Sequence, residues 1–244
     1  MRETAGTSRP PLDRHPPPTY GQSFWRTESR KFSEPWYRLE KTTRLIGTLT
    51  HGRKCELLDV GCGPATLMRM LPPNIEYHGI DIAIHDPAPN LLEADLLEAP
   101  IAFGEMQFDI VVAQGLFEYL GGAQAQKFVE ISQVLRPSGV FIVTYTNFGH
   151  RRRYVSEAFS NVQPFEQFRA SLSQYFTIDR IIPESHNWKH AQPNRPWLKL
   201  LNLHVNRRVP LISRKLAVEY YFVCSPPKAS RTQGKSWVSV APLQ

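Results

Sequence analysis

An acidic residue two positions before a Gly-x-Gly turn is the pattern in this chain with the clearest chemical meaning. Asp59-Val60-Gly61-Cys62-Gly63 ends the apolar run Glu56–Val60 and precedes a helical stretch. Glycines permit a sharp turn and let the backbone approach a ligand closely. A phosphate-binding turn gains nothing from the charge of Asp59, and the dinucleotide fingerprint would need glycine where this chain has Thr66. The pattern therefore favours a ligand that carries positive charge.

Acidic residues also follow the next strands along the chain. Asp81 lies at the end of a predicted strand, Glu76–Ile82, roughly twenty residues beyond Gly61, where a carboxylate can accept both hydroxyls of a ribose. We favour this role over that of an aspartate capping a turn. Two more segments occupy comparable places: Glu93-Ala94-Asp95-Leu96, and Ala113–Leu120 directly after the predicted strand Phe108–Ala113.

The elements that must position these residues alternate between helices and short apolar strands. We expect helices over residues 36–49, 66–71 and 123–135, and strands over 56–60, 76–82, 108–113, 140–145, 177–182 and 217–224. Near-continuous apolar strands separated by helices are typical of a sheet covered on both faces. The predicted fold is a Rossmann-like, doubly wound α/β fold with a mostly parallel seven-stranded sheet.

Residues 55–145 resemble the class I S-adenosylmethionine-dependent methyltransferases, whose ordered motifs match the segments above. S-adenosylmethionine carries an ammonium and a sulfonium, which suits a carboxylate at the turn. The resemblance implies that Asp59 and the Gly61–Ala65 backbone, including Cys62 and Gly63, line the methionine part of the cofactor. It further implies that Asp81 binds the ribose, that Ile82 and Leu96 lie beside the adenine, and that Asp95 holds the adenine amino group. Gln114, Gly115 and Leu116 would form the wall near the methyl group.

Two positions depart from the family pattern. Ala65 replaces a frequent glycine but still leaves room for the cofactor. Many small-molecule methyltransferases have leucine-glutamate-histidine after the fourth strand, whereas this chain has Phe117-Glu118-Tyr119. The segment therefore does not supply a histidine base.

The catalytic base is expected to be His150, just past the fifth strand in a basic loop, although a plain surface histidine fits that position equally well. A base is needed only if the acceptor is a hydroxyl or a protonated amine. Tyr145, Asn147 and Glu118 are weaker candidates for contacting the acceptor. Along the chain no group of His, Cys and acidic residues has metal-ligand spacing, so no metal is expected.

The domain organisation follows from composition. Residues 1–20 and 226–244 are expected to be tails, the first rich in proline, and 21–225 a single methyltransferase domain. Within it, 184–216 is expected to be an insertion that could act as an acceptor lid. Its basic and apolar part, 195–216, could also contact a membrane surface, although a helix packed on the sheet edge is the plainer interpretation.

The overall composition is that of a globular protein, with 41% hydrophobic and 21% charged residues. A net charge of +7 permits an acidic partner. The three cysteines form no paired framework, and the sequence begins with no signal-like apolar run, so the cytoplasm is the expected location.

The leading interpretation is methyl transfer to oxygen or nitrogen of a small-molecule acceptor: a sugar, a lipid-linked compound or a secondary metabolite. Methylation of RNA or protein is the alternative. Against it, Ala113-Gln114-Gly115-Leu116 stands where base-amino methyltransferases carry an Asn/Asp-Pro-Pro-aromatic motif, and no nucleic-acid module is visible. A non-catalytic binding protein on the same fold and a nicotinamide oxidoreductase are the remaining possibilities.

Overall fold

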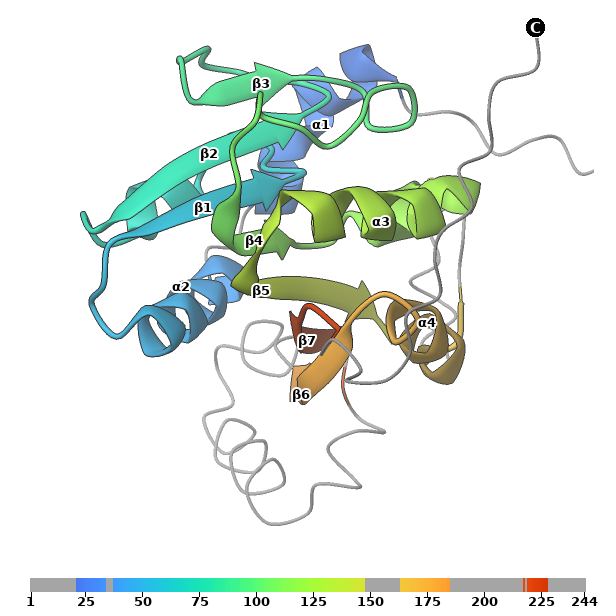
Figure 1. Cartoon of the computed structure of the whole chain (residues 1–244). Helices are drawn as coiled ribbons and strands as arrows, with labels where there is room; N and C mark the ends of the chain where they lie inside the picture. Colours follow the sequence, from blue (N-terminus) through green and yellow to red (C-terminus); the bar gives the residue numbers. More distant parts are fainter. Residues whose placement is uncertain (1–20, 34–36, 148–162, 185–216, 218, 228–244) are drawn as a thin grey trace, which may run out of the picture.

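The computed structural model describes residues 21–33, 37–147, 163–184, 217 and 219–227. Its central feature is a seven-stranded sheet (Figure 1). The strands are β1 (Cys55–Val60), β2 (Ile75–Asp81), β3 (Leu91–Glu93), β4 (Phe108–Ala113), β5 (Leu135–Thr146), β6 (Thr177–Glu184) and β7 (Glu219–Ser225), in the spatial order β3-β2-β1-β4-β5-β7-β6. Strands β1 to β5 pair in parallel, and β7 runs antiparallel to both β5 and β6. The predicted sheet is confirmed.

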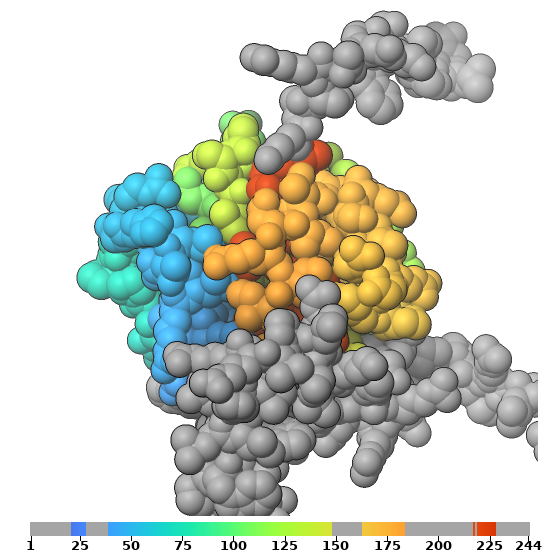
Figure 2. All heavy atoms as spheres, turned by 90° about the horizontal axis from the view of Figure 1, so that it is seen from below, coloured from blue at the N-terminus to red at the C-terminus, as the bar shows by residue number. Residues whose placement is uncertain are grey.

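Helices cover both faces of this sheet. They are α1 (Gln22–Ser33), α2 (Tyr37–Thr50), α3 (Gln124–Val134) and α4 (Phe165–Leu172), with short 3-10 helices η1 (Leu67–Met70), η2 (Phe117–Tyr119) and η3 (Gly121–Ala123). Residues of α2 belong to one buried cluster, and residues of α3 and α4 belong to another. Figure 1 shows α2 and α3 on opposite sides of the sheet. Figure 2 shows blue residues of the N-terminal part beside orange residues of β6, where Lys41 Nζ lies 3.5 Å from the carbonyl oxygen of Pro183.

The buried strands owe their positions to apolar side chains on both faces. In β1, Leu57 belongs to the α2 cluster, whereas Leu58 and Val60 belong to the cluster shared with α3 and α4. All three side chains are at most 1% exposed. Burial on both faces explains why Leu57 and Leu58 stand side by side in this strand instead of alternating with polar residues.

Three local features differ from the expectation. Helices α1 and α4 are additional to the predicted elements. The helical stretch predicted over residues 66–71 is only the single 3-10 turn η1. It has little room, because Ala65 has a left-handed backbone (φ +50°) just before it and Pro72-Pro73 follow soon after.

The expected tails, apart from residues 226 and 227, and most of the 184–216 segment, with its expected membrane contact, lie outside the described residues. Of the helices that are described, none has the length and apolar character needed to cross a bilayer.

Candidate functional site

The residues expected from the sequence to bind the cofactor gather at one edge of the sheet. This carboxyl edge is the edge at which the parallel strands β1, β2 and β4 end. The chain crosses from β1 to β2 on one side and later returns to β4 on the other, so the strand order reverses at β1. Ligands of open α/β sheets bind outside the carboxyl ends of the strands at such a reversal. The fold therefore defines where a ligand should lie.

The turn after β1 is built around Gly61. Its φ of +77° is a left-handed conformation that favours glycine. A Cβ added there would lie 3.1 Å from Leu116 Cδ1, so the turn packs closely on the loop after β4. The backbone N–H groups of Gly61 and Cys62 both donate to the carbonyl oxygen of Ile80, at 2.8 and 3.2 Å. The turn is thus held between the ends of β2 and β4.

The rest of the turn continues in left-handed backbone. Gly63 has a φ of +53° and Ala65 a φ of +50°. The alanine adopts the conformation that the family's usual glycine would adopt more easily. Burial raises the pKa of the Cys62 thiol, so this side chain stays protonated and packs as a small apolar group.

Asp59 is buried immediately before the turn, with only 5% of its surface exposed. Tyr77 Oη donates a hydrogen bond to Asp59 Oδ2 at 2.8 Å. Burial raises the pKa of Asp59 to about 7; the Tyr77 hydroxyl opposes this rise and the charge of Asp81 adds to it. A carboxyl group with this pKa becomes fully ionised when a cation is placed beside it.

Asp81 links the turns after β1 and β2. Its Oδ2 accepts the backbone N–H of Gly63 at 2.8 Å, and its Oδ1 accepts that of Ala83 at 3.0 Å. Burial raises the pKa of Asp81, while these two N–H donors lower it in part. Each carboxylate oxygen can accept a second hydrogen bond, so both retain capacity for a ligand hydroxyl.

The residues expected near the adenine lie in the loops after β2 and β3. Ile82 is half-buried next to Asp81, and Asp95 is half-buried with Oδ1 accepting the N–H of Leu97 at 2.9 Å. Leu96 is 5% exposed and belongs to the core shared with α3. Leu96 therefore anchors the loop after β3 to this buried core.

Gln114 and Gly115 are fixed at the end of β4 by three neighbouring elements. Gln114 Oε1 accepts a hydrogen bond from Thr42 Oγ1 of α2 at 2.8 Å, and its Nε2 donates to Tyr221 Oη of β7 at 3.2 Å. The N–H of Gly115, whose φ is +63°, donates to Thr144 Oγ1 of β5 at 2.9 Å. Both residues are thus held in place at the end of β4, between β1 and β5.

Helix α1 completes this edge, and sequence reasoning missed it. Arg26 Nη2 forms an ion pair with Glu93 Oε1 at 2.9 Å, and Glu93 Oε2 accepts the N–H of Ile84 at 3.0 Å. The hydrogen bond from the Ile84 N–H lowers the pKa of Glu93, and the charge of Arg26 lowers it further. The ring of Trp25 meets that of Tyr119 edge to face at 5.0 Å. Helix α1 therefore contacts the end of β3 and the 3-10 helix η2 after β4, and the aromatic pair Phe24-Trp25 was the available signal for it.

The structure does not place the residues expected to contact the acceptor at an open surface of this edge. His150 lies outside the described residues. Tyr145 and Asn147 are buried: the Tyr145 ring stacks on Phe168 at 3.8 Å, and Asn147 Nδ2 donates to the carbonyl of Ala217 at 3.0 Å. In the described part of the chain these two residues serve packing and strand pairing.

Glu118, in the 3-10 helix η2 after β4, is buried, with 1% of its surface exposed. Its Oε1 accepts both the N–H and the hydroxyl of Thr146 at 2.8 Å, and its buried Oε2 has no hydrogen-bond partner. Burial raises its pKa, Thr146 lowers it in part, and the charge of Glu219 raises it. Glu118 thereby ties the loop after β4 to the end of β5.

The described residues fit S-adenosylmethionine in two respects. Two buried carboxyl groups with raised pKa values, those of Asp59 and Asp81, lie where a cationic ligand and a ribose would be bound. In the turn between them, a Cβ added at Gly63 would meet nothing within 4 Å, so the backbone there is open to a ligand. A site of this charge suits a cation better than a pyrophosphate.

Comparison with known proteins agrees with this geometry. The family model described as "Methyltransferase domain" matches residues 58–143, which run from β1 to β5. No curated protein matches the chain in sequence.

Solved structures share the fold at low identity. An S-adenosylmethionine-dependent methyltransferase from Clostridium acetobutylicum aligns with a TM-score of 0.56 at 12% identity, covering 82% of this chain and 98% of its own. N-methyltransferase NodS from Bradyrhizobium japonicum, in complex with S-adenosyl-L-homocysteine, aligns at 0.55 and 15%, covering 85% and 98%. PH0226 protein from Pyrococcus horikoshii aligns at 0.54 and 16%, covering 78% and 89%.

The family match and the shared fold indicate an α/β enzyme of the S-adenosylmethionine-dependent methyltransferase type. Residues 58–143 match the methyltransferase-domain family, and the sheet that contains them is shared with solved S-adenosylmethionine-dependent methyltransferases.

Proposed function

We propose that this methyltransferase acts on oxygen or nitrogen of a small-molecule acceptor: a sugar, a lipid-linked compound or a secondary metabolite. The observation that carries the proposal is the position of α1 across the carboxyl edge. It touches Glu93 at the end of β3 through Arg26, and Tyr119 after β4 through Trp25. A helix attached at both ends of the ligand edge suits an enclosed acceptor better than a polynucleotide or a folded protein.

The proposed cofactor contacts follow the strand ends in order. Asp59 and the backbone of Gly61, Cys62 and Gly63 hold the methionine part, with the carboxylate of Asp59 facing its positive charge. Asp81 accepts the ribose hydroxyls. Ile82 and Leu96 flank the adenine and Asp95 accepts its amino group, while Gln114 and Gly115 bound the methyl group. Supporting these roles, Asp81 already spans the turns after β1 and β2 through Gly63 and Ala83.

The chemistry that the bound cofactor supplies is a methyl group on a sulfonium: the acceptor's lone pair takes the methyl carbon, and the S–C bonding pair stays on sulfur. The protein's part is to align the acceptor with that bond and exclude water. The wall of Gln114, fixed by Thr42 and Tyr221, is suited to alignment because it cannot easily move. His150 would take the proton that a hydroxyl or ammonium acceptor loses.

Among acceptors, amines should be tried first. One structural neighbour, NodS, is described as an N-methyltransferase. The net charge of +7 works against an amine acceptor at long range, so the panel must include the other acceptor classes as well.

The test measures S-adenosyl-L-homocysteine release from the full chain with panels of small amines, phenols, sugars and lipid-linked hydroxyl compounds, beside total RNA and mixed protein. We expect turnover with at least one small-molecule class and loss of that turnover in Asp81→Ala. Turnover with RNA or protein alone would contradict the small-molecule assignment. Turnover that persists in Asp81→Ala would contradict the proposed cofactor contacts.

A further inference from the structure

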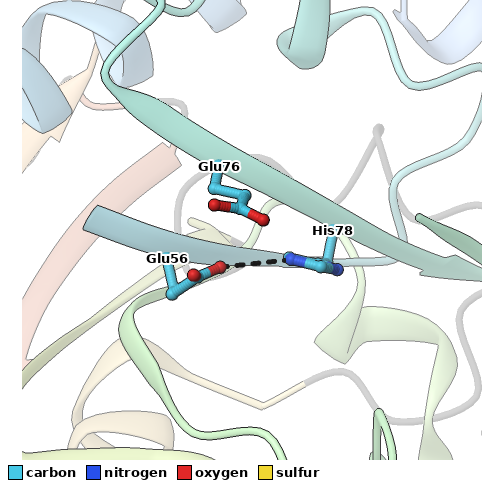
Figure 3. A group of neighbouring side chains, drawn as sticks. All are labelled: Glu56, Glu76 and His78. Carbon is cyan, nitrogen blue, oxygen red and sulfur yellow. Dashed lines mark hydrogen bonds and ion pairs between the residues drawn. The ribbon is translucent and has the colours of Figure 1, made fainter. Parts of the chain in front are cut away.

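A second group of ligand-type side chains lies far from the carboxyl edge, in the first half of β1 and β2. Glu56 of β1 pairs in register with Glu76 of β2, and His78 follows two residues later on the same face. Figure 3 shows the three side chains directed toward one another across the two strands. His78 precedes Asp81 by three residues, which is about 10 Å along a strand. The group is therefore separate from the methyl-transfer site.

The two carboxylates are unfavourable neighbours. Like charges directly opposite each other on paired strands destabilise a sheet. Lys54 Nζ lies 3.4 Å from Glu76 Oε2, but the two side chains are 81% and 51% exposed, so this ion pair compensates little. Glu56 has no lysine or arginine within ion-pair distance among the described residues. A cation between Glu56 and Glu76 would remove the repulsion.

His78 is buried, with 8% of its surface exposed, and points one nitrogen at this pair. Its Nε2 lies 3.2 Å from Glu56 Oε2. Its ring packs against Phe103 and Phe108, with centroids 5.0 and 5.5 Å apart. Its Nδ1 is buried without a hydrogen-bond partner. Buried polar atoms are rarely left unsatisfied. Aromatic packing, not a second hydrogen bond, thus holds the ring with Nε2 toward the carboxylates.

The spacing of the three ligand atoms suits a small divalent cation. All three lie within 4.8 Å of one another. Bonds of about 2.0–2.2 Å to a tetrahedral zinc ion place two ligands roughly 3.3 Å apart. The observed 3.2 Å between His78 and Glu56 already matches that spacing. Glu76 is the most exposed of the three and can rotate to complete the set.

We propose that Glu56, Glu76 and His78 bind one Zn²⁺ ion that cross-links β1 and β2 at the amino end of the sheet. An imidazole nitrogen with two carboxylates selects zinc over Mg²⁺ and Ca²⁺, which prefer all-oxygen sets. Solvent water takes the fourth position, beside the hollow that Glu76 and His78 line together with Met68 and Asn90.

The proposed site is open and of moderate affinity. With the metal on Nε2, the ring proton moves to Nδ1, where the described residues offer no acceptor. Metal-binding histidines usually donate this proton to a partner. We therefore expect weaker binding than at a closed four-ligand zinc centre. The ion's role is to stabilise the fold, since the methyl-transfer edge lies at the other end of the strands.

The test uses the full chain, freed of any affinity tag and stripped with a chelator. Zn²⁺ is titrated by calorimetry, and Co²⁺ by its visible d–d absorption. We expect one saturable site, a rise in Tm with Zn²⁺ but not with Mg²⁺, and at least tenfold weaker binding in Glu56→Gln and in Glu76→Gln. Glu76 is half-exposed, so its variant should fold. Glu166→Gln, on the exposed surface of α4, is the matched control and should bind like wild type.

Two results would overturn the proposal. Absence of zinc binding would leave Glu56 and His78 as an ordinary hydrogen-bonded pair. Zinc binding of equal strength in both glutamine variants would place the ion elsewhere on the chain. Neither result bears on methyl transfer. We expect the rate of methyl transfer to be unchanged in all three variants.

Discussion

At the scale of residues, the site depends on buried carboxyl groups that are only partly compensated. Asp59 has one strong donor, Tyr77, and a pKa raised to about 7. Asp81 has two backbone donors and a smaller rise. Such groups carry unfavourable charge in the free protein and gain most from a cationic ligand.

Cofactor binding should therefore release a proton. In the free protein at about pH 6, Asp59 is largely protonated; a cation beside it lowers its pKa, so the proton leaves on binding. Affinity for S-adenosylmethionine should rise with pH up to about 7 and then level off. Calorimetry at about pH 6 in two buffers of different ionisation enthalpy measures the release, which Asp59→Asn should abolish. An equal release in that variant would assign the proton to another group.

Gly61→Ala should separate backbone strain from site geometry. The left-handed φ of +77° costs an alanine about 1–2 kcal/mol, and the added Cβ meets Leu116 at 3.1 Å. We expect at least tenfold weaker cofactor binding by calorimetry.

Gly104→Ala is the matched control for that variant. Its φ is +61° and its Cβ would meet nothing within 4 Å, so it should lose stability but bind cofactor normally. Equal loss of binding in the two variants would show that the effect is general destabilisation.

Residue types at the carboxyl edge could be predicted from the sequence, but their contacts could not. The pattern Asp59-x-Gly61-x-Gly63 and the position of Asp81 reveal the turn and the strand end. The hydrogen bond from Tyr77 depends on the pairing of β1 with β2. For the same reason, sequence spacing gave no sign of the group formed by Glu56, Glu76 and His78, whose members meet across two strands.

At the scale of elements, α1 is the part that sequence periodicity did not reveal. Its described contacts lie on loops at the carboxyl edge, not in the sheet core, through Arg26 to Glu93 and Trp25 to Tyr119. An element whose role is to cover an edge leaves a weaker apolar signal than one that packs on a sheet.

Loosening α1 should speed cofactor exchange. In the double variant Trp25→Ala, Arg26→Ala both contacts are lost, so we expect S-adenosyl-L-homocysteine to dissociate several-fold faster in stopped-flow measurements while Tm changes little. Arg44→Ala removes a comparable exposed ion pair, with Glu40 on α2, and serves as the control. If the double variant and the control exchange ligand at the wild-type rate, α1 does not cover the site.

At the scale of the whole molecule, the order of strands and helices was predictable and the short elements were not. Strand β4 is apolar and buried on both faces except at Asp109, and this run of apolar residues identifies it from sequence. The 3-10 turn η1 has a helical sequence but is limited by Ala65 on one side and Pro72 on the other. Its short length is set by backbone conformation, which the spacing of apolar residues does not predict.

A buried ion pair of α3 is hydrogen-bonded to the loop before β4. Lys127, 1% exposed, donates to Glu130 Oε2 and to the carbonyl of Ala99, both at 2.8 Å. Burial would raise the pKa of Glu130, but Lys127 and the N–H of Ile101 together lower it.

Lys127→Ala leaves the Glu130 charge buried and should cost about 3–5 kcal/mol of unfolding free energy in urea titrations. Arg169→Ala, which removes an exposed pair with Glu166, should cost less than about 1 kcal/mol. Similar losses in the two variants would show that the buried pair is not a main support of α3.

The measurement that tests the central claim most directly is a calorimetric titration of the full chain with S-adenosylmethionine, S-adenosyl-L-homocysteine and NADH, beside Asp81→Ala. The account predicts that both adenosyl ligands bind, that NADH does not, and that Asp81→Ala loses the binding while remaining folded by circular dichroism. Binding of NADH, or undiminished binding of the adenosyl ligands to Asp81→Ala, would contradict a cofactor site at the ends of β1 and β2.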